Sequence, residues 1–267
     1  MDDQRYNQRA APGGGAAPRP VVILAIADEV RESLTVPGAV DLGGIPDVVL
    51  SAGDLPFDYV ASVAAAHDVP CAMVPGNHDP SLEGYRPGRL GWHRAGMPAD
   101  WPGPTGAWAA DRDAVEVADL RIAGLGGCAR YSTGPNQWTP AAARRRARRT
   151  RHRARRLSHR SSPGPDGLGG RLADVLLTHS PGLAGADPDP AHRGLDAVDG
   201  LVRDLAPALH LHGHVHPHGR TRPFSEVVRD DGRPSTLIVN TVGWTLLRLH
   251  PAHAGAPSRA ELVHVGR

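Results

Sequence analysis

Polar residues that commonly bind metal ions follow several short apolar segments of this sequence. Asp28 follows the segment VVILAIA, Asp54 ends the segment VVLSAGD, and His179 follows DVLLT. Apolar runs of this length are typical of strands that are buried on both faces of a sheet. Because ligands of open α/β sheets bind beyond the carboxyl ends of the strands, we expect these residues to meet at one edge. Four more candidates follow the segments CAMVPG and LHLHG, namely Asn77, His78, His214 and His216.

The chemistry of this set is that of a divalent metal site. It offers carboxylates, an amide oxygen and imidazoles but no thiolate, a combination that suits Mn, Fe, Zn or similar ions. Gly53, Gly76 and Gly213 each precede a candidate ligand, where a glycine lets the chain turn sharply and approach another segment closely. The predicted ligands are Asp28, Asp54, Asn77, His179, His214 and His216.

The segments that would position these ligands alternate between apolar runs and helix-like stretches, which is the rhythm of an α/β fold. Tyr59–His67 has a helical composition. Thr139 followed by Pro140 is a typical helix start, with threonine as N-cap and proline in the first turn. Strands are predicted at Val21–Ala27, Asp47–Ser51, Ala72–Val74, Ala114–Val117, Leu120–Leu125, Val175–Thr178, Leu209–His212, Thr236–Val239, Leu246–Leu249 and Leu262–Val265.

Composition divides the chain into a tail and one domain. Residues 1–19 are polar, rich in Gly, Ala and Pro, and without period, so we expect a disordered tail. Residues 20–267 are expected to form one domain, which is long enough to bury a large core. Within it, residues 80–108 show no clean period and predict a long functional or mobile loop. A breaker rich in Ser, Pro and Gly predicts a flexible linker at about 161–170.

Arginine is concentrated in one segment. All 30 basic residues are arginines, and ten of the seventeen residues from Arg144 to Arg160 are arginine, within an Arg-rich helix predicted at about 139–160. A basic helix of this kind can bind nucleic acid. However, we expect its arginines to lie on all sides of the helix, and no aromatic residue lies between them. A solvated helix is therefore the favoured interpretation, and nucleic-acid contact stays an alternative.

The order of the candidate ligands resembles the signature of the calcineurin-like metallophosphoesterases. The resemblance rests on Asp28, Gly53-Asp54, Gly76-Asn77-His78-Asp79, His179 and Gly213-His214-Val215-His216, and it covers residues 21 to about 243. It implies an α/β fold, a four-layer α-β-β-α sandwich with two facing mixed sheets. It also implies that Asp54 bridges two metal sites. Asn77, His179 and His214 would complete one site, and Asp28 and His216 would serve the other.

The same resemblance implies a function. A member of this family hydrolyses a phosphomonoester or a phosphodiester with a metal-activated hydroxide, using one or two divalent ions. Mn is the expected metal, and Fe, Zn or Ni are alternatives. His78 resembles the catalytic histidine, which stabilises the transition state and donates a proton to the leaving oxygen. Asp58 is the candidate that orients His78, and Arg130, with Tyr131 beside it, is the candidate that binds the substrate phosphate.

Two positions depart from the family's pattern. The first motif is usually Asp-x-His, but Val30 occupies the histidine position and cannot bind a metal. Glu29 is a possible substitute, although an extended chain would point it away from the side of Asp28. The second departure is in GDLPFD, where Phe57 occupies the position of the usual aspartate and Asp58 comes one residue late. These departures keep two alternatives open: a catalytically weak or inactive interaction scaffold, and a nuclease that uses the Arg-rich helix.

The cysteines, the apolar runs and the amino-terminal segment of the sequence give less information about function. Cys71 and Cys128 lie far apart without metal-ligand spacing, which favours a reduced pair over a disulfide. No apolar run reaches the roughly eighteen residues of a membrane helix. No signal-peptide segment precedes the first predicted strand, so we expect a cytoplasmic protein without membrane contact. The expected partner is a phosphate-ester substrate, and the sequence does not indicate an oligomeric state.

Overall fold

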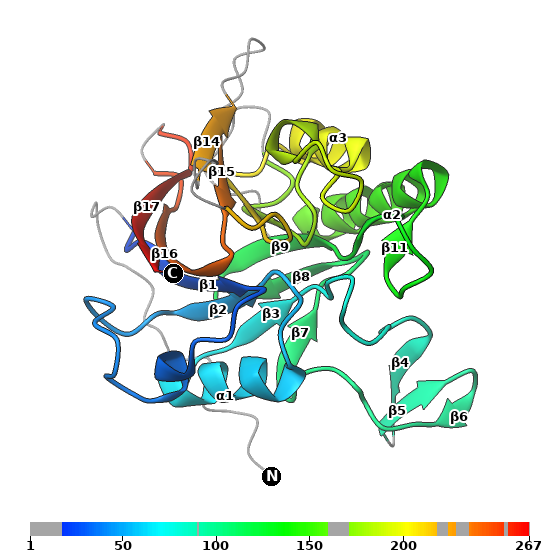
Figure 1. The fold of residues 1–267 in the computed structure, drawn as a ribbon. Coiled ribbons are helices and arrows are strands. Elements are labelled where there is room, and N and C mark those ends of the chain that lie inside the picture. The colour runs from blue at the N-terminus through cyan, green and yellow to red at the C-terminus, as the bar shows by residue number, and fades with distance from the viewer. Residues whose placement is uncertain are drawn as a thin grey trace.

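A computed structural model of the protein describes residues 18–89, 91–159, 171–217, 224–227, 235–253 and 256–266. Residues 1–17 of the predicted tail and the predicted linker at 161–170 lie outside these ranges. Two large mixed sheets dominate the described part of the chain (Figure 1). In the same part, no helix is both long and apolar enough to cross a membrane.

Sheet 1, the first of the two large sheets, contains the strands that precede Asp28, Asp54 and Asn77. β1, β2 and β3 run parallel to one another, whereas β16 runs antiparallel to β1. Most of β1 is fully buried, as expected for a central strand that is covered on both faces. The strand order is β17 (Arg259–Gly266), β16 (Gly243–His250), β1 (Val21–Ala27), β2 (Val48–Ser51), β3 (Cys71–Met73) and β7 (Ala107–Ala109).

Sheet 2 contains the strands that precede His179 and His214. Its four central strands are parallel, and an antiparallel strand lies at each edge. The parallel strands require crossover connections, two of which carry helices. The strand order is β14 (Phe224–Val227), β15 (Thr236–Asn240), β13 (Leu209–His212), β12 (Val175–Thr178), β9 (Leu120–Leu125) and β8 (Ala114–Val117).

Helices cover the outer face of each sheet (Figure 1). α1 (Phe57–His67) and the short 3-10 helix η1 (Glu32–Thr35) pack on sheet 1. α2 (Pro140–Ser158) and α3 (Asp196–Leu205) pack on sheet 2, and a second short helix, η2 (Leu183–Gly185), precedes α3. Between the two sheets lies a third apolar cluster, to which both sheets contribute Val, Leu, Ile and Ala side chains. These layers confirm the α/β four-layer α-β-β-α sandwich with two facing mixed sheets.

Residues 80–108 are not the long loop that the sequence predicts. They contain an antiparallel sheet of β4 (Tyr85–Gly88), β5 (Gly91–Arg94) and β6 (Met97–Pro98), followed by β7 of sheet 1. Trp92 stacks on Trp101 with ring centroids 4.0 Å apart. These strands are short and rich in Gly and Pro, so they give no period-2 signal, and ring packing holds them instead. A further parallel pair, β10 (Cys128–Ala129) and β11 (Gln137–Trp138), directly precedes α2.

Candidate metal centre

The strands of both sheets bring the predicted ligands to one edge of the sandwich. Asp28 directly follows β1, and His179 directly follows β12. Asp54, Asn77 and His214 lie two to four residues beyond the carboxyl ends of β2, β3 and β13. Because these strands are parallel within each sheet, their carboxyl ends meet where the two sheets face each other.

Three of the predicted ligands have a left-handed backbone. The φ angles are 61° at Asp28, 56° at Asp54 and 69° at His214. A non-glycine residue in this region costs on the order of 1–3 kcal/mol, and such residues concentrate at functional sites. The conformation turns the chain sharply at each strand end. Neighbouring glycines allow this close approach, because a Cβ on Gly76 would lie 2.0 Å from Asp54 Oδ1.

Asp54, Asn77, His179 and His214 form a group that can hold a metal ion. One ligand atom from each of Asp54, His179 and His214 lies within 4.8 Å of the others. His179 Nε2 is 2.9 Å from Asn77 Oδ1 and 3.2 Å from Asp54 Oδ2. The amide nitrogen of Asn77 donates to the hydroxyl of Tyr131 at 3.2 Å, so its oxygen faces the group. Oxygen and imidazole donors therefore converge from both sheets.

The electrostatics of His179 fit a metal ion. Its Nδ1 lies 2.8 Å from the carbonyl oxygen of Ala52, and its Nε2 faces the oxygens of Asn77 and Asp54, so both nitrogens face acceptors. Burial alone would lower the pKa of His179, but the hydrogen bond and charge of Asp54 raise it to about 9. Both the geometry and this pKa favour a protonated ring at neutral pH, and a divalent cation would compete with the proton for Nε2.

The backbone around Asp54 is fixed by hydrogen bonds. His78 N donates to Asp54 Oδ1 at 2.8 Å. The Oδ2 atom of Asp79 accepts from the backbone N–H groups of Asp54 and Gly76, at 2.9 and 2.7 Å. Burial raises the pKa of Asp79 to about 6, although these two hydrogen bonds oppose the rise. Burial also favours a higher pKa for Asp54, but His179 outweighs it and the pKa of Asp54 falls below its usual value.

His214 is held as a neutral imidazole. Its Nε2 lies 2.8 Å from the carbonyl oxygen of Ala191, so Nε2 carries the proton and Nδ1 is the nitrogen available to an ion. Burial, followed by the positive charge of His179, lowers the pKa of His214 to about 3. A neutral imidazole is the form that binds a metal.

The Asp28 half of the site is built differently. The backbone N–H of His214 lies 3.1 and 3.0 Å from the two carboxylate oxygens of Asp28. His216 Nδ1 lies 3.6 Å from Glu29 Oε1, and Glu29 forms a 2.5 Å ion pair with Arg31. Val30 is 39% exposed. Glu29 is therefore directed to His216 and Arg31, and the side chain of Val30 offers no atom that could bind a metal.

The structure places the three remaining candidates on the surface. His78 is exposed and directly follows Asn77 in the chain. Arg130 is exposed between β10 and α2, and its Nη2 donates to the carbonyl oxygen of Gln137 at 3.4 Å. Asp58 is exposed in the first turn of α1. Among the described residues, the hydrogen bonds and ion pairs do not link Asp58 to His78, so its orienting role stays a prediction.

Several residues that support the site have no role predicted from the sequence. Asp79 belongs to the GNHD motif but received no role, although it holds two backbone N–H groups of the site. The side chain of Asn136 donates to the carbonyl oxygens of Gly76 and Asp79, at 2.8 and 3.0 Å. Nothing in the sequence marks Asn136 or the carbonyl of Ala191, because both act from loops distant along the chain.

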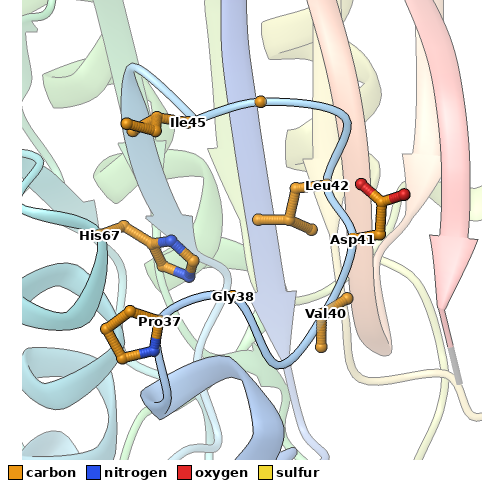
Figure 2. Close-up of a pocket in the computed structure, with 8 residues that line it drawn as sticks. Pro37, Gly38, Val40, Asp41, Leu42, Ile45 and His67 are labelled. Carbon is orange, nitrogen blue, oxygen red and sulfur yellow. The ribbon is translucent and has the colours of Figure 1, made fainter.

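A cavity elsewhere in the molecule takes no part in this site. It has a volume of about 390 Å³ and lies between the loop at 37–45 and His67. Figure 2 shows the ring of His67 beside this loop. The loop leads into the amino end of β2, whereas the candidate ligands lie at the carboxyl ends of the strands. The cavity therefore lies at the opposite edge of sheet 1.

A comparison with family models and a comparison with solved structures both found matches to this chain. A family model described as calcineurin-like phosphoesterase matches residues 23–218. One similar solved structure is the crystal structure of TT1561 of Thermus thermophilus, with a TM-score of 0.50 and 15% identity, covering 92% of this chain and 100% of that one. Another is GAP50, the anchor in the inner membrane complex of Plasmodium, with a TM-score of 0.45 and 11% identity, covering 92% and 85%. No curated protein matches the chain. Because the family model spans most of the sequence, the chain belongs to the calcineurin-like phosphoesterase family.

Proposed function

We propose that this protein is a metal-dependent phosphoesterase that hydrolyses a phosphomonoester or a phosphodiester. The convergence of Asp54, Asn77, His179 and His214 carries the proposal. Buried polar groups from two sheets would be costly to hold together without a common partner. A divalent ion bound there would polarise a phosphoryl oxygen and lower the pKa of water.

The other residues of the site have distinct proposed roles. Asp54 is held by the backbone of His78, so its carboxylate is fixed before substrate binds. His78 is exposed next to Asn77 in the chain, and its imidazole would stabilise the transition state and donate a proton to the leaving oxygen. Arg130, which is exposed beside the site loops, would bind a substrate phosphate through its guanidinium group.

The proposed metal requirement is one ion in the group of Asp54, Asn77, His179 and His214. Mn suits this mixture of oxygen and imidazole donors, and Fe, Zn or Ni also fit it. A second ion would rest on Asp28, Asp54 and His216. Because Val30 takes the place of a histidine, we propose that this second ion binds more weakly than the first.

A second candidate function is an interaction scaffold that keeps the fold without catalysis. The observation that favours it is the solvent-exposed Val30 at a usual ligand position. The two candidates differ in their metal content and in the role of His78, so one set of measurements separates them.

Hydrolysis by reconstituted protein tests the proposal. The protein is stripped of metal with a chelator, refilled with Mn, and assayed with p-nitrophenyl phosphate and bis-p-nitrophenyl phosphate. Mn is expected to restore hydrolysis of at least one ester. His78→Ala is expected to lower kcat by roughly 100-fold or more while the bound Mn stays unchanged. His264→Ala, which removes an exposed histidine of β17, is the matched control and keeps full activity.

Two results would contradict parts of this account. Full activity in His78→Ala would remove His78 from the mechanism. Bound Mn without hydrolysis of either ester would favour the scaffold over the phosphoesterase.

A further inference from the structure

Helix α2 presents a cationic face to solvent. Six of the seven exposed basic residues of this helix lie within about 120° of its circumference, at about 100° per residue. They extend over about 16 Å of helix length. We call them the α2 basic face: Arg145, Arg148, Arg149, His152, Arg155 and Arg156.

The opposite side of α2 is buried against sheet 2, so the arginines do not surround the helix as the sequence suggested. Small residues dominate the buried side, with Ala143, Ala147, Thr150 and Ala154 packed against the sheet. Arg146 is also on this side and is 5% exposed. The arginines that are not buried therefore lie in two places. Arg144, Arg151 and Arg153 lie at the edges of the buried side, and the others form a single outward face.

The arginines at the edges and those of the α2 basic face differ in their ion-pair partners. Arg144, Arg151 and Arg153 pair with Asp196, Asp204 and Asp113, at 3.0, 2.7 and 3.5 Å. By contrast, the side chains of the five arginines in the basic face have no ion pair or hydrogen bond within the described part of the chain. α2 also contains no acidic residue. Like charges three and four residues apart destabilise a helix, so this face is an unbalanced cluster that an external anion would stabilise.

The chemistry of the face fits a phosphodiester backbone better than a membrane. A peripheral helix needs exposed apolar residues beside its basic residues in order to enter the lipid interface. The α2 basic face contains no apolar residue, and Ala143, Ala147 and Ala154 of the same helix are buried on sheet 2 instead. A nucleic acid presents successive phosphates along a line, and guanidinium groups bind phosphate through paired hydrogen bonds. About 16 Å of helix can follow several such phosphates.

Hydrogen bonds tie the start of α2 to the metal centre. β11 leads directly into α2, and Asn136, just before β11, donates to the carbonyl oxygen of Gly76. Arg146 forms an ion pair with Asp111 at 2.5 Å and another ion pair with Glu83. Its guanidinium also lies 3.6 Å from the ring centre of Trp138. The segment that leads into α2 is therefore anchored to the loop that carries Asn77 and His78.

We propose that the α2 basic face binds the phosphate backbone of a nucleic acid and leads it towards the metal centre. Docking on α2 is a property of the helix, whereas the assignment of nucleic acid as substrate class rests on the proposed phosphoesterase function.

Salt-dependent binding tests docking separately from hydrolysis. Fluorescent single-stranded and duplex oligonucleotides of about 20 nucleotides are titrated in EDTA with the full-length protein, from about 50 to 200 mM salt. The test variant carries Arg145→Gln, Arg148→Gln, Arg149→Gln and Arg156→Gln. The control variant removes the same charge from exposed positions outside α2, with Arg86→Gln, Arg89→Gln, Arg248→Gln and Arg259→Gln. A third variant replaces the four α2 arginines by lysine.

The wild type is expected to bind, with a log K that falls linearly with log salt. The glutamine variant should bind at least tenfold more weakly at low salt, with a slope smaller by about 3. The control should stay within twofold of the wild type, and the lysine variant should keep most of the slope. The glutamine variant should also keep Mn-dependent hydrolysis of bis-p-nitrophenyl phosphate.

Absence of oligonucleotide binding by the wild type would overturn the proposal. So would an equal loss in the control variant, a glutamine variant that also loses small-ester hydrolysis, or binding of phosphatidylserine vesicles in place of oligonucleotides. If no variant and no wild type hydrolyses any ester, the proposed function fails, but the binding result still decides whether α2 docks nucleic acid.

Discussion

The protonation of His179 depends on the neighbouring carboxylate of Asp54. Both of its ring nitrogens face acceptors, and Asp54 raises its pKa to about 9 against the effect of burial. Because this pKa lies above the usual value of 6.5, the protonated ring stabilises the metal-free fold fully below pH 6.5. That contribution is lost as the pH rises through about 9. A bound ion and the Nε2 proton are therefore competitors.

Metal affinity should consequently rise with pH. From about pH 7 towards pH 9, the affinity for Mn is expected to increase by roughly tenfold per pH unit, because binding displaces one proton from His179. Titration calorimetry in buffers of different ionisation enthalpy would measure the released proton. An affinity that does not change with pH in this range, or no proton release, would contradict the assignment of His179 as an ion ligand.

Gly76 has a steric role next to Asp54. A Cβ at this position would lie 2.0 Å from Asp54 Oδ1 and 2.6 Å from the backbone nitrogen of Asp54. Gly76→Ala is therefore expected to displace Asp54 and to weaken Mn binding by at least tenfold, as measured by equilibrium dialysis.

Gly200 is the matched control, because it lies inside α3 and an added Cβ meets only the end of the Arg203 side chain, at 3.7 Å. Gly200→Ala should leave Mn binding unchanged and raise the free energy of unfolding by up to about 1 kcal/mol. If both alanine variants bind Mn like the wild type, the carboxylate of Asp54 is not a ligand at its present position.

At the scale of elements, short strands rich in apolar residues were the most predictable parts of the fold. β1, β8, β9, β12 and β13 have the bounds that the sequence predicts. Their signal is local, since each strand contains its own apolar residues within a short segment. The start of α2 was also predictable, because Thr139 caps it by accepting from Ala142 N at 3.3 Å.

Elements without a local signal were missed. α3 begins after Leu195, which makes no side-chain cap hydrogen bond, and it contains Gly200 in its centre. The contacts of Asn136 and Ala191 at the metal centre depend on loops that meet only after folding. By contrast, the ligand residues follow strands directly, so their position at the carboxyl edge could be predicted.

Two arginines of α2 should respond to substitution in opposite ways. Arg146 is buried and forms ion pairs with Asp111 and Glu83, so Arg146→Gln removes the closest cation from the largely buried Asp111 carboxylate and should lower the free energy of unfolding by about 3 kcal/mol. Arg148 is exposed among like charges, so Arg148→Glu should raise the free energy of unfolding by about 1 kcal/mol.

Urea unfolding with both variants measures the difference, and Arg148→Gln should fall between Arg148→Glu and the wild type. If Arg146→Gln is as stable as the wild type, the packing of α2 on sheet 2 does not depend on its buried ion pairs.

At the scale of the whole molecule, the candidate metal centre draws residues from both sheets. Asp54 and Asn77 follow strands of sheet 1, whereas His179 and His214 follow strands of sheet 2. An ion bound to all four would link the two halves of the sandwich at one edge. A ligand that binds only the folded state stabilises it in proportion to the logarithm of its free concentration.

Metal removal should therefore lower the stability of the whole fold. At free Mn about 100-fold above Kd, the expected gain is about 2.7 kcal/mol relative to the chelated protein. Thermal unfolding with and without EDTA measures it as a shift in Tm. His179→Ala removes a ligand, so its Tm should no longer depend on Mn. A Tm of the wild type that is the same with Mn and with EDTA would show that no ion links the sheets.

The most direct test of the central claim is the metal content of the purified protein, determined by mass spectrometry after equilibration with Mn. The wild type is expected to retain one tightly bound ion per chain. Asp54→Ala and His214→Ala should lose it, whereas His264→Ala should keep it. Retention of Mn by both ligand variants, or a wild type that binds no metal, would contradict the assignment of this site as a metal centre.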